Sequence, residues 1–195
     1  MNILKTSLFI CTVLISACGG SDAYVPKPRA FPRLDLPEIS YKSFDSSGIP
    51  YSFEIPVYAA MEKDTLNVYT RQPNWFNLNF KPFNATLHLT YYRFQGWNEF
   101  DSLIDDTRKL VNKHIQRAED IIEEPFTSSG NVKGMLFDIE GNTATNLNFY
   151  VTDSAKHFLR GALYFNSQAA ADSTAPVFER MRKDVGHLIK TFRWK

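Results

Sequence analysis

The sequence predicts a single α+β domain, in which an antiparallel sheet of about six strands is covered by a long central helix and a C-terminal helix. Two observations support this fold class. Six short runs alternate apolar with polar residues and are joined by short links, which is typical of antiparallel strands. Two longer runs repeat their apolar residues at helical spacing, so each helix would bury one stripe against the sheet.

The first three predicted strands are residues 51–57, 75–80 and 85–92. Pro56 lacks a backbone N–H, which favours an edge position for the first of them. The second and third are joined by residues 81–84 and predict a hairpin. Two faces alternate along the third strand, one with Ala85, Leu87, Leu89 and Tyr91 and the other with Thr86, His88, Thr90 and Tyr92.

Residues 99–123 are predicted to form the long helix. Asn98 is a plausible N-cap, the apolar residues follow helical spacing almost without a break, and Pro125 would end the helix. His114 falls on this apolar stripe. We therefore interpret it as a histidine of the core rather than as a ligand of a metal ion.

Three more strands are predicted at residues 132–139, 146–152 and 157–165, separated by residues typical of turns. The final helix should begin near Thr174, with Pro176 at its first position. Its buried stripe is predicted to contain Val177, Phe178, Met181, Val185, Leu188, Ile189 and Phe192.

The first seventeen residues have the pattern of a bacterial signal peptide. Lys5 precedes an uncharged, mostly apolar run at residues 7–17, which ends in small residues immediately before Cys18. A cysteine at this place indicates a lipoprotein signal, in which the leader is cut before Cys18 and the cysteine carries fatty acyl chains such as palmitate. The alternatives are a buried N-terminal helix or an ordinary cleavage site. The apolar run is too short to span a bilayer.

The predicted organisation is therefore a signal peptide at residues 1–17, a lipidated, proline-rich tether at residues 18–50 and a single α+β domain at residues 51–195. Half of the ten prolines lie in the tether. Proline disfavours helices and central strands, so the tether should contain neither.

Composition excludes several classes of protein and predicts neither a cofactor nor a metal ion. The formal charge of +1 lacks the excess of Lys and Arg expected of a nucleic-acid-binding protein. Two cysteines cannot build a disulfide framework or a four-thiolate zinc site. None of the four histidines has another ligand at metal-binding spacing, and no nucleophile elbow is present. We identify no catalytic residue and expect a protein that is not an enzyme.

One polar segment is denser than the rest of the chain. Lys156, His157 and Arg160 follow Asp153 closely, between two predicted strands. These three residues are candidates for contact with a partner or an anion. The alternative, which we favour, is ordinary turn chemistry followed by outward-facing strand residues.

Three motifs in chain order resemble the gliding-motility lipoprotein GldD family. They are residues 25–37 (VPKPRAFPRLDLP), residues 83–91 (FNATLHLTY) and residues 150–165. The order of elements is also similar to that of the PsbP/Mog1-like sandwich. The resemblance implies a protein of the Bacteroidetes envelope that is involved in gliding and in type 9 secretion. It carries over Cys18 as the lipidation site and no catalytic residue.

The resemblance also implies where the protein lies and what it contacts. We expect a lipoprotein anchored in the outer membrane and facing the periplasm, because only one acidic residue, Asp22, closely follows Cys18. Its expected partners are membrane lipid, through the acylated cysteine, and other gliding or secretion lipoproteins. The expected role is non-enzymatic assembly or stabilisation of that machinery. The alternative is a periplasmic ligand-binding module on a PsbP-like fold.

Overall fold

The computed structural model describes residues 35–64, 74–115, 117–128, 130–141, 143, 145–166 and 171–195. Residues 34–195 form one compact unit. This unit begins before residue 51, the predicted start of the domain, because strand β1 (Tyr41–Phe44) pairs with β2 (Tyr51–Pro56). The predicted signal peptide and Cys18 lie outside the described residues, so the lipid anchor stays a prediction.

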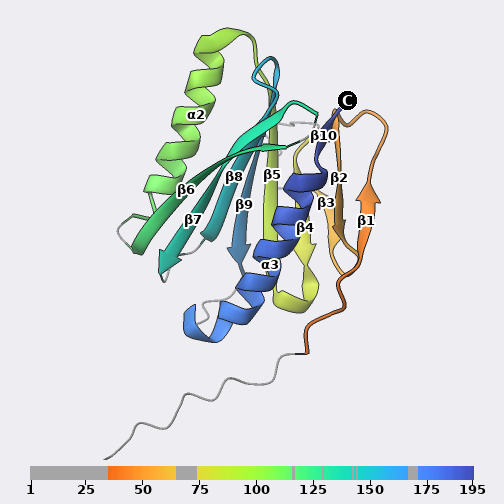
Figure 1. Ribbon diagram of the computed structural model, residues 1–195, viewed down its shortest axis with the longest axis vertical. Helices are drawn as coiled ribbons and strands as arrows, with labels where there is room; N and C mark the ends of the chain where they lie inside the picture. Colours follow the sequence, from red (N-terminus) through yellow and green to blue (C-terminus); the bar gives the residue numbers. More distant parts are fainter. Residues whose placement is uncertain are drawn as a thin grey trace, which may run out of the picture. The chain divides into compact units, whose positions relative to one another are not determined.

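The predicted fold class, an α+β domain with two helices and antiparallel sheets, is confirmed. The larger sheet has seven strands in an entirely antiparallel arrangement. From one edge to the other they are β3 (Ala60–Lys63), β4 (Phe76–Phe80), β5 (Ala85–Arg93), β9 (His157–Phe165), β8 (Thr145–Thr152), β7 (Val132–Gly141) and β6 (Ala118–Ser128). A register of nine residue pairs places β5 beside β9 near the centre of the sheet; the two strands are far apart in sequence but adjacent in space (Figure 1).

A separate sheet of three strands contains β2 between β1 and β10 (Arg193–Trp194). The prediction that this strand lies at an edge is therefore wrong. Pro56 is nevertheless tolerated, because β10 pairs only with Tyr51 and Ser52 at the opposite end of β2.

The predicted hairpin is confirmed as β4 and β5, joined by a short 3-10 helix, η2 (Lys81–Phe83), and by Asn84. Asn84 adopts the left-handed conformation, with φ of 46°, that asparagine tolerates better than most residues. The predicted alternation along β5 is also confirmed. Leu87 and Leu89 belong to the main hydrophobic core, whereas His88 and Thr90 point to the other face of the sheet.

The long helix is shorter than predicted. Helix α2 spans Gly96–Asn112, with Gln95 as its N-cap in place of Asn98. The carboxylate of Glu99 accepts a hydrogen bond from the backbone N–H of Gln95 at 2.6 Å, which satisfies a donor that the helix start leaves free.

The last six residues of the predicted helix, 118–123, belong instead to strand β6, and Pro125 does not end a helix but lies within this strand. Ile121 and Ile122 continue the helical spacing by chance, but their branched side chains also suit a strand. β6 pairs only with β7, so the missing N–H of Pro125 is tolerated at the edge of the sheet.

Helix α3 spans Ala171–Thr191, so it begins before Thr174 and contains Pro176 in its interior, contrary to the prediction. Its predicted apolar stripe is confirmed. Met181, Val185 and Leu188 are at most 1% exposed.

The two helices cover opposite faces of the seven-stranded sheet. Successive residues of β9 contact different helices, because Leu159 belongs to the core that contains the α3 stripe and Phe158 packs against Phe100 of α2. Figure 1 shows α3 crossing the sheet and α2 lying near β6. The three-stranded sheet shares the α3 face, since Tyr51 and Phe53 of β2 belong to the same core.

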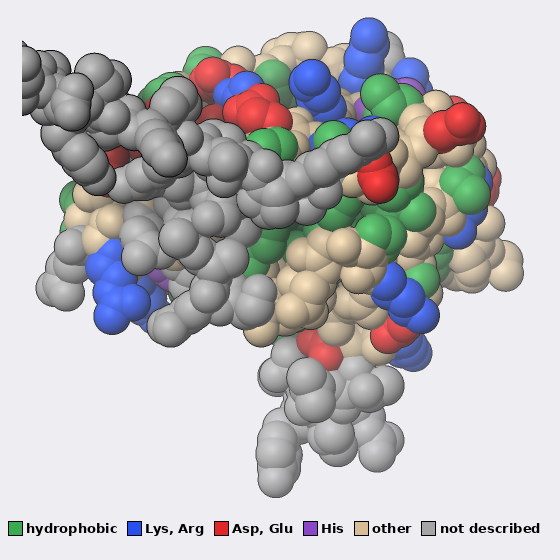
Figure 2. All heavy atoms as spheres, turned by 90° about the horizontal axis from the view of Figure 1, so that it is seen from below, with side chains coloured by type: hydrophobic (Ala, Val, Ile, Leu, Met, Phe, Trp, Pro, Cys, Tyr) green, Lys and Arg blue, Asp and Glu red, His purple; other side chains and the backbone are tan. Residues whose placement is uncertain are grey.

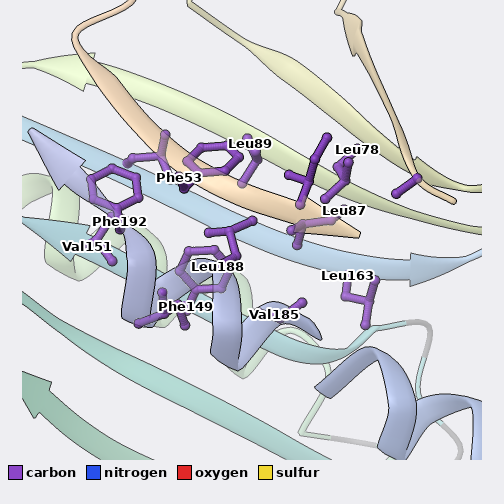
Figure 3. Close-up of a cluster of buried hydrophobic side chains, with 14 of the residues drawn as sticks. Phe53, Leu78, Leu87, Leu89, Phe149, Val151, Leu163, Val185, Leu188 and Phe192 are labelled. Carbon is purple, nitrogen blue, oxygen red and sulfur yellow. The ribbon is translucent and has the colours of Figure 1, made fainter. Parts of the chain in front are cut away.

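The main core lies between α3, β2 and the seven-stranded sheet. Figure 3 shows Phe53 of β2, Phe149 of β8 and Leu188 of α3 meeting in this space with Phe192, which lies between α3 and β10. Packing is close: a Cβ atom at Gly161 would lie 2.2 Å from a ring carbon of Phe149, so only glycine fits opposite this ring.

Charged side chains of both signs cover the surface. Figure 2 shows Lys and Arg interspersed with Asp and Glu on the visible face. This agrees with the nearly balanced count of 22 basic and 21 acidic residues. No helix in the described part of the chain is both long and apolar enough to cross a membrane.

Candidate functional site

The turn between β8 and β9 is held by Asp153. One carboxylate oxygen of Asp153 accepts hydrogen bonds from the backbone N–H groups of Ala155, Lys156 and His157, each at 2.9 Å. Burial alone would raise the pKa of Asp153, but these three donors outweigh it and lower the pKa. Asp153 therefore acts as a turn-forming residue.

The structure does not bring Lys156, His157 and Arg160 together. Lys156 is exposed in the turn. His157 is 5% exposed on the core face of β9, where its Nδ1 lies 2.6 Å from the hydroxyl of Tyr91 and its ring stacks on Trp194. Arg160 lies on the opposite face of the sheet, toward α2. These three residues therefore do not form the predicted contact cluster.

A cavity of about 480 Å³ lies on the α2 face of the sheet and is the candidate functional site. Strands β5, β8 and β9 form its floor, and the C-terminal half of α2 with the following turn forms its wall. Its volume is within the range of small-molecule sites. Of the predicted contact residues, only Arg160 lines it.

The floor places three polar side chains of neighbouring strands side by side. Thr90 of β5 is directly opposite Arg160 of β9, and His88 lies two residues from Thr90 on the same face. The Thr90 hydroxyl is buried and has no hydrogen-bond partner among the described residues. Sequence reasoning placed His88 and Thr90 on one face but neither placed Arg160 beside them nor found the cavity, because both depend on the register between β5 and β9.

The surroundings of His88 favour its neutral form. Its Nδ1 lies 2.7 Å from the amide oxygen of Asn77, so this nitrogen carries the hydrogen and Nε2 is left as an acceptor. Burial lowers the pKa of His88, and the charge of Asp64 opposes this with a smaller effect. The His88 ring also meets Tyr164 edge to face, with ring centroids 5.4 Å apart.

The wall contains Leu110 and Val111 of α2, followed by Lys113 and His114. The prediction that His114 is a core residue on the helix is wrong, because α2 ends at Asn112 and His114 is only partly buried in the turn that follows. Burial lowers the pKa of His114, and the neighbouring charge of Lys113 lowers it further.

The charge that lines the cavity is positive. Lys113 and Arg160 are both cationic, and none of the described residues that line the cavity is acidic. Within the described part of the chain, Arg160 makes no ion pair. The arrangement can therefore hold an anionic group against the sheet.

The opposite face contains a buried polar cluster of a different kind. Arg180 and Asp184 of α3 form an ion pair at 3.2 Å, with side chains 7% and 0% exposed. The hydroxyls of Tyr41 and Tyr58 both donate to the Asp184 carboxylate. Burial, together with this hydrogen bond, raises the pKa of Tyr41 to about 12.

This cluster fastens the start of the described chain to α3. The guanidinium of Arg180 donates to the backbone oxygens of Pro37 at 2.9 Å and of Glu38 at 3.3 Å. The polar groups of this cluster therefore pair with one another and with the backbone, as buried charges require. We interpret this cluster as structural.

Comparison with known proteins identifies the family. The family model described as "Gliding motility lipoprotein GldD" matches residues 21–194, which is most of the chain. The chain belongs to the gliding motility lipoprotein GldD family. The predicted family is thereby confirmed, and with it an association with gliding motility. Cys18 precedes the matched residues. A search of curated proteins found no match.

One solved structure supports the fold of this GldD family member. The solution structure of cyanobacterial PsbP (CyanoP) from Synechocystis sp. PCC 6803 matches with a TM-score of 0.50 and 10% sequence identity, covering 84% of this chain and 98% of that chain. The predicted PsbP-like sandwich is therefore confirmed. At this identity the likeness concerns the fold alone.

The described part of this GldD family member contains no group of three or more His, Cys, Asp or Glu side chains placed to hold a metal ion. His88 and His114 both line the cavity, but the other polar residues of its lining are Thr90, Thr107, Asn148, Tyr164 and the cationic Lys113 and Arg160, which do not complete a metal site. The lining of the cavity therefore suits an anion better than a metal ion.

Proposed function

We propose that the protein is a non-enzymatic lipoprotein that assembles or stabilises the gliding motility and type 9 secretion machinery at the outer membrane. The observation that carries the proposal is the match of the GldD family model to residues 21–194. The compact unit of residues 34–195 would be held at the membrane by acyl chains on Cys18, and more than one chain is needed for a stable anchor.

A strain that lacks the gene tests this role. We expect it to lose gliding and type 9 secretion, and to contain less of the other gliding lipoproteins on immunoblots. Complementation with wild-type protein should restore all three readouts. A deletion strain that glides and secretes normally would contradict the proposal.

The two cysteines provide a matched pair for testing the anchor. Cys18→Ser removes the acylation site, so we expect the protein to leave the membrane fraction and complementation to fail. Cys11→Ser makes the same chemical change within the predicted leader and should complement fully. Equal complementation by both variants would show that the lipid on Cys18 is dispensable.

Location and partners need separate measurements. We propose that the protein faces the periplasm, so protease added to intact cells should leave it whole, and disruption of the outer membrane should expose it. Crosslinking in the native envelope, followed by mass spectrometry, should recover other gliding or secretion lipoproteins. Degradation in intact cells would place the protein on the cell surface instead.

A second candidate function is the binding of a small molecule. The cavity beneath α2 supports it, because about 480 Å³ is enough for a ligand and polar groups converge on its floor. This function is compatible with an assembly role, since a bound ligand would stabilise the folded domain. Binding of small molecules to the purified protein tests it directly.

A further inference from the structure

The cavity beneath α2 contains polar groups that the protein itself does not satisfy. The hydroxyl of Thr90 is buried without a hydrogen-bond partner in the described part of the chain. The guanidinium of Arg160, directly opposite on β9, is partly buried and makes no ion pair with any described residue. Partly buried polar groups of this kind are normally paired, so both are available to a ligand.

These groups favour an anion. Arginine offers a planar fork of donors that matches a carboxylate or another oxyanion, and a threonine hydroxyl can add one more donor. Lys113 adds a second positive charge at the wall, and none of the described lining residues would repel an anion. By contrast, the buried Arg180 on the other face already has Asp184 as its counter-ion.

The rest of the lining favours a ligand that also has an apolar part. Leu110 and Val111 line the wall, and Ala162 and the Tyr164 ring line the floor. A free inorganic ion would leave these surfaces unfilled, because the cavity is much larger than one oxyanion.

We propose that this cavity binds a small organic anion, whose oxyanion head contacts Arg160 and Thr90 and whose apolar body packs beneath α2. The proposal rests on the second candidate function, small-molecule binding. It does not depend on the assembly role, so each can fail while the other holds.

A pair of probes that differ only in charge tests the proposal. The lipidated protein in nanodiscs of zwitterionic phospholipid is titrated with 4-phenylbutyrate or with 4-phenylbutyramide, and ligand-observed NMR follows binding, with empty nanodiscs as the blank. We expect the carboxylate to bind at least about tenfold more tightly than the amide, because hydrogen bonds to charged groups are the stronger ones. Equal affinities, or binding of neither probe, would overturn the proposal.

Inorganic phosphate provides the third arm, because it has the oxyanion but no apolar body. We expect it to displace 4-phenylbutyrate only weakly. If phosphate binds as tightly as 4-phenylbutyrate does, the apolar part of the proposal is overturned and the site is one for a free oxyanion.

Matched variants assign the binding to this cavity. Arg160→Gln should weaken binding of the carboxylate by about tenfold or more, whereas Arg93→Gln removes the same charge from an exposed position outside the cavity and should not change it. Thr90→Val is the second cavity variant and should weaken binding without removing a charge. Unchanged affinity in folded Arg160→Gln and Thr90→Val proteins would overturn the proposal, and thermal unfolding establishes that each variant is folded.

Failure of this proposal and failure of the assembly role give different results. Loss of binding in the Arg160→Gln protein is measured on purified protein and does not require a gliding machine. A deletion strain with normal gliding would contradict only the assembly role, and absence of binding to the wild-type protein would contradict only the ligand site.

Discussion

The two faces of the seven-stranded sheet each carry one helix, but the helices are packed very differently. On the α3 face, Met181, Val185 and Leu188 are at most 1% exposed, and β2 adds a further layer of aromatic side chains. On the α2 face, the helix buries only Phe100, Thr107 and Val111. The α3 face is therefore a filled core, whereas the α2 face leaves a cavity and an exposed helix.

The buried polar groups of the two faces differ as well, although Trp194 Nε1 on the α3 side is also buried without a partner in the described chain. On the α3 face, Arg180 and Asp184 are paired with each other and with tyrosine hydroxyls. On the α2 face, Thr90 has no partner in the described chain. Unpaired buried polar groups cost stability, so a fold retains them most readily where a ligand supplies the partner. The comparison indicates that one face provides stability and the other provides a site.

The largest expected difference between the faces is in the cost of removing a phenylalanine. Phe149→Ala removes a ring that is 0% exposed in the α3 core and leaves a cavity there. The free energy of unfolding should therefore fall by about 3–5 kcal/mol. Phe100→Ala on α2 should cost less than Phe149→Ala, because Phe100 is 9% exposed and packs in a much smaller cluster. Urea unfolding followed by circular dichroism measures both. Equal costs would contradict the division into a filled and an open face.

Carboxylate-to-amide changes compare the ion pairs of the two faces. Asp184→Asn leaves the buried Arg180 without its counter-ion, so the free energy of unfolding should fall by about 3 kcal/mol. This is the lower end of the range for breaking a buried ion pair, because the tyrosine hydroxyls remain as hydrogen-bond partners at position 184. Asp106→Asn breaks an exposed pair with Lys109 on α2 and should change stability by less than about 0.5 kcal/mol. The same unfolding assay applies, and a cost below 1 kcal/mol for Asp184→Asn would show that the buried cluster contributes little.

The buried histidine of the α3 face should make stability depend on pH. Burial lowers the pKa of His157, the charge of Asp153 opposes this, and Lys156 and Arg93 lower the pKa further. The unfolded chain therefore takes up the proton first, and stability is lost as the pH falls below the ordinary histidine pKa of about 6.5, by at most about 1.4 kcal/mol per pH unit for one histidine.

Unfolding at pH 7.5 and pH 5.5 measures this effect. We expect His157→Gln to reduce the difference between the two pH values more than His114→Gln does, because His114 is only partly buried near α2. His88 also has a pKa lowered by burial, so a part of the dependence should remain in both variants. An unchanged pH dependence in His157→Gln would mean that this histidine is not the main source.

The difference between the faces also explains which features the sequence could predict. The α3 stripe and the alternation of β5 follow from local periodicity, and both are confirmed. The end of α2 could not be found in this way, because Ile121 and Ile122 continue the helical spacing into a segment that pairs with β7. Pairing with β7, the next strand along the chain, decided the structure there, and helical spacing alone contains no signal for that pairing.

The site was harder to predict than the fold for the same reason. Arg160 was a candidate because it lies in a dense polar segment, but that segment also contained His157, which points to the other face of the sheet. Alternation along β9 separates these two residues and could have been used to divide the cluster. The pairing of Arg160 with Thr90 needed the register between β5 and β9, which the structure alone provided.

The smallest expected effect concerns the two tryptophans that lie on different faces. Trp97 of α2 is 68% exposed and meets Phe100 edge to face, so Trp97→Ser should change the free energy of unfolding by less than about 0.5 kcal/mol. Trp194 of β10 packs against Tyr51, Phe192 and His157, so Trp194→Ser should be clearly destabilising.

Circular dichroism suits this pair of variants, because each change removes a fluorophore and would distort a fluorescence signal. If Trp97→Ser proves as costly as Trp194→Ser, the outer side of α2 contributes to stability and the contrast between the faces disappears. If it is neutral, the variant can be introduced into cells, where any loss of gliding must come from a lost contact rather than from unfolding, since folding is unchanged.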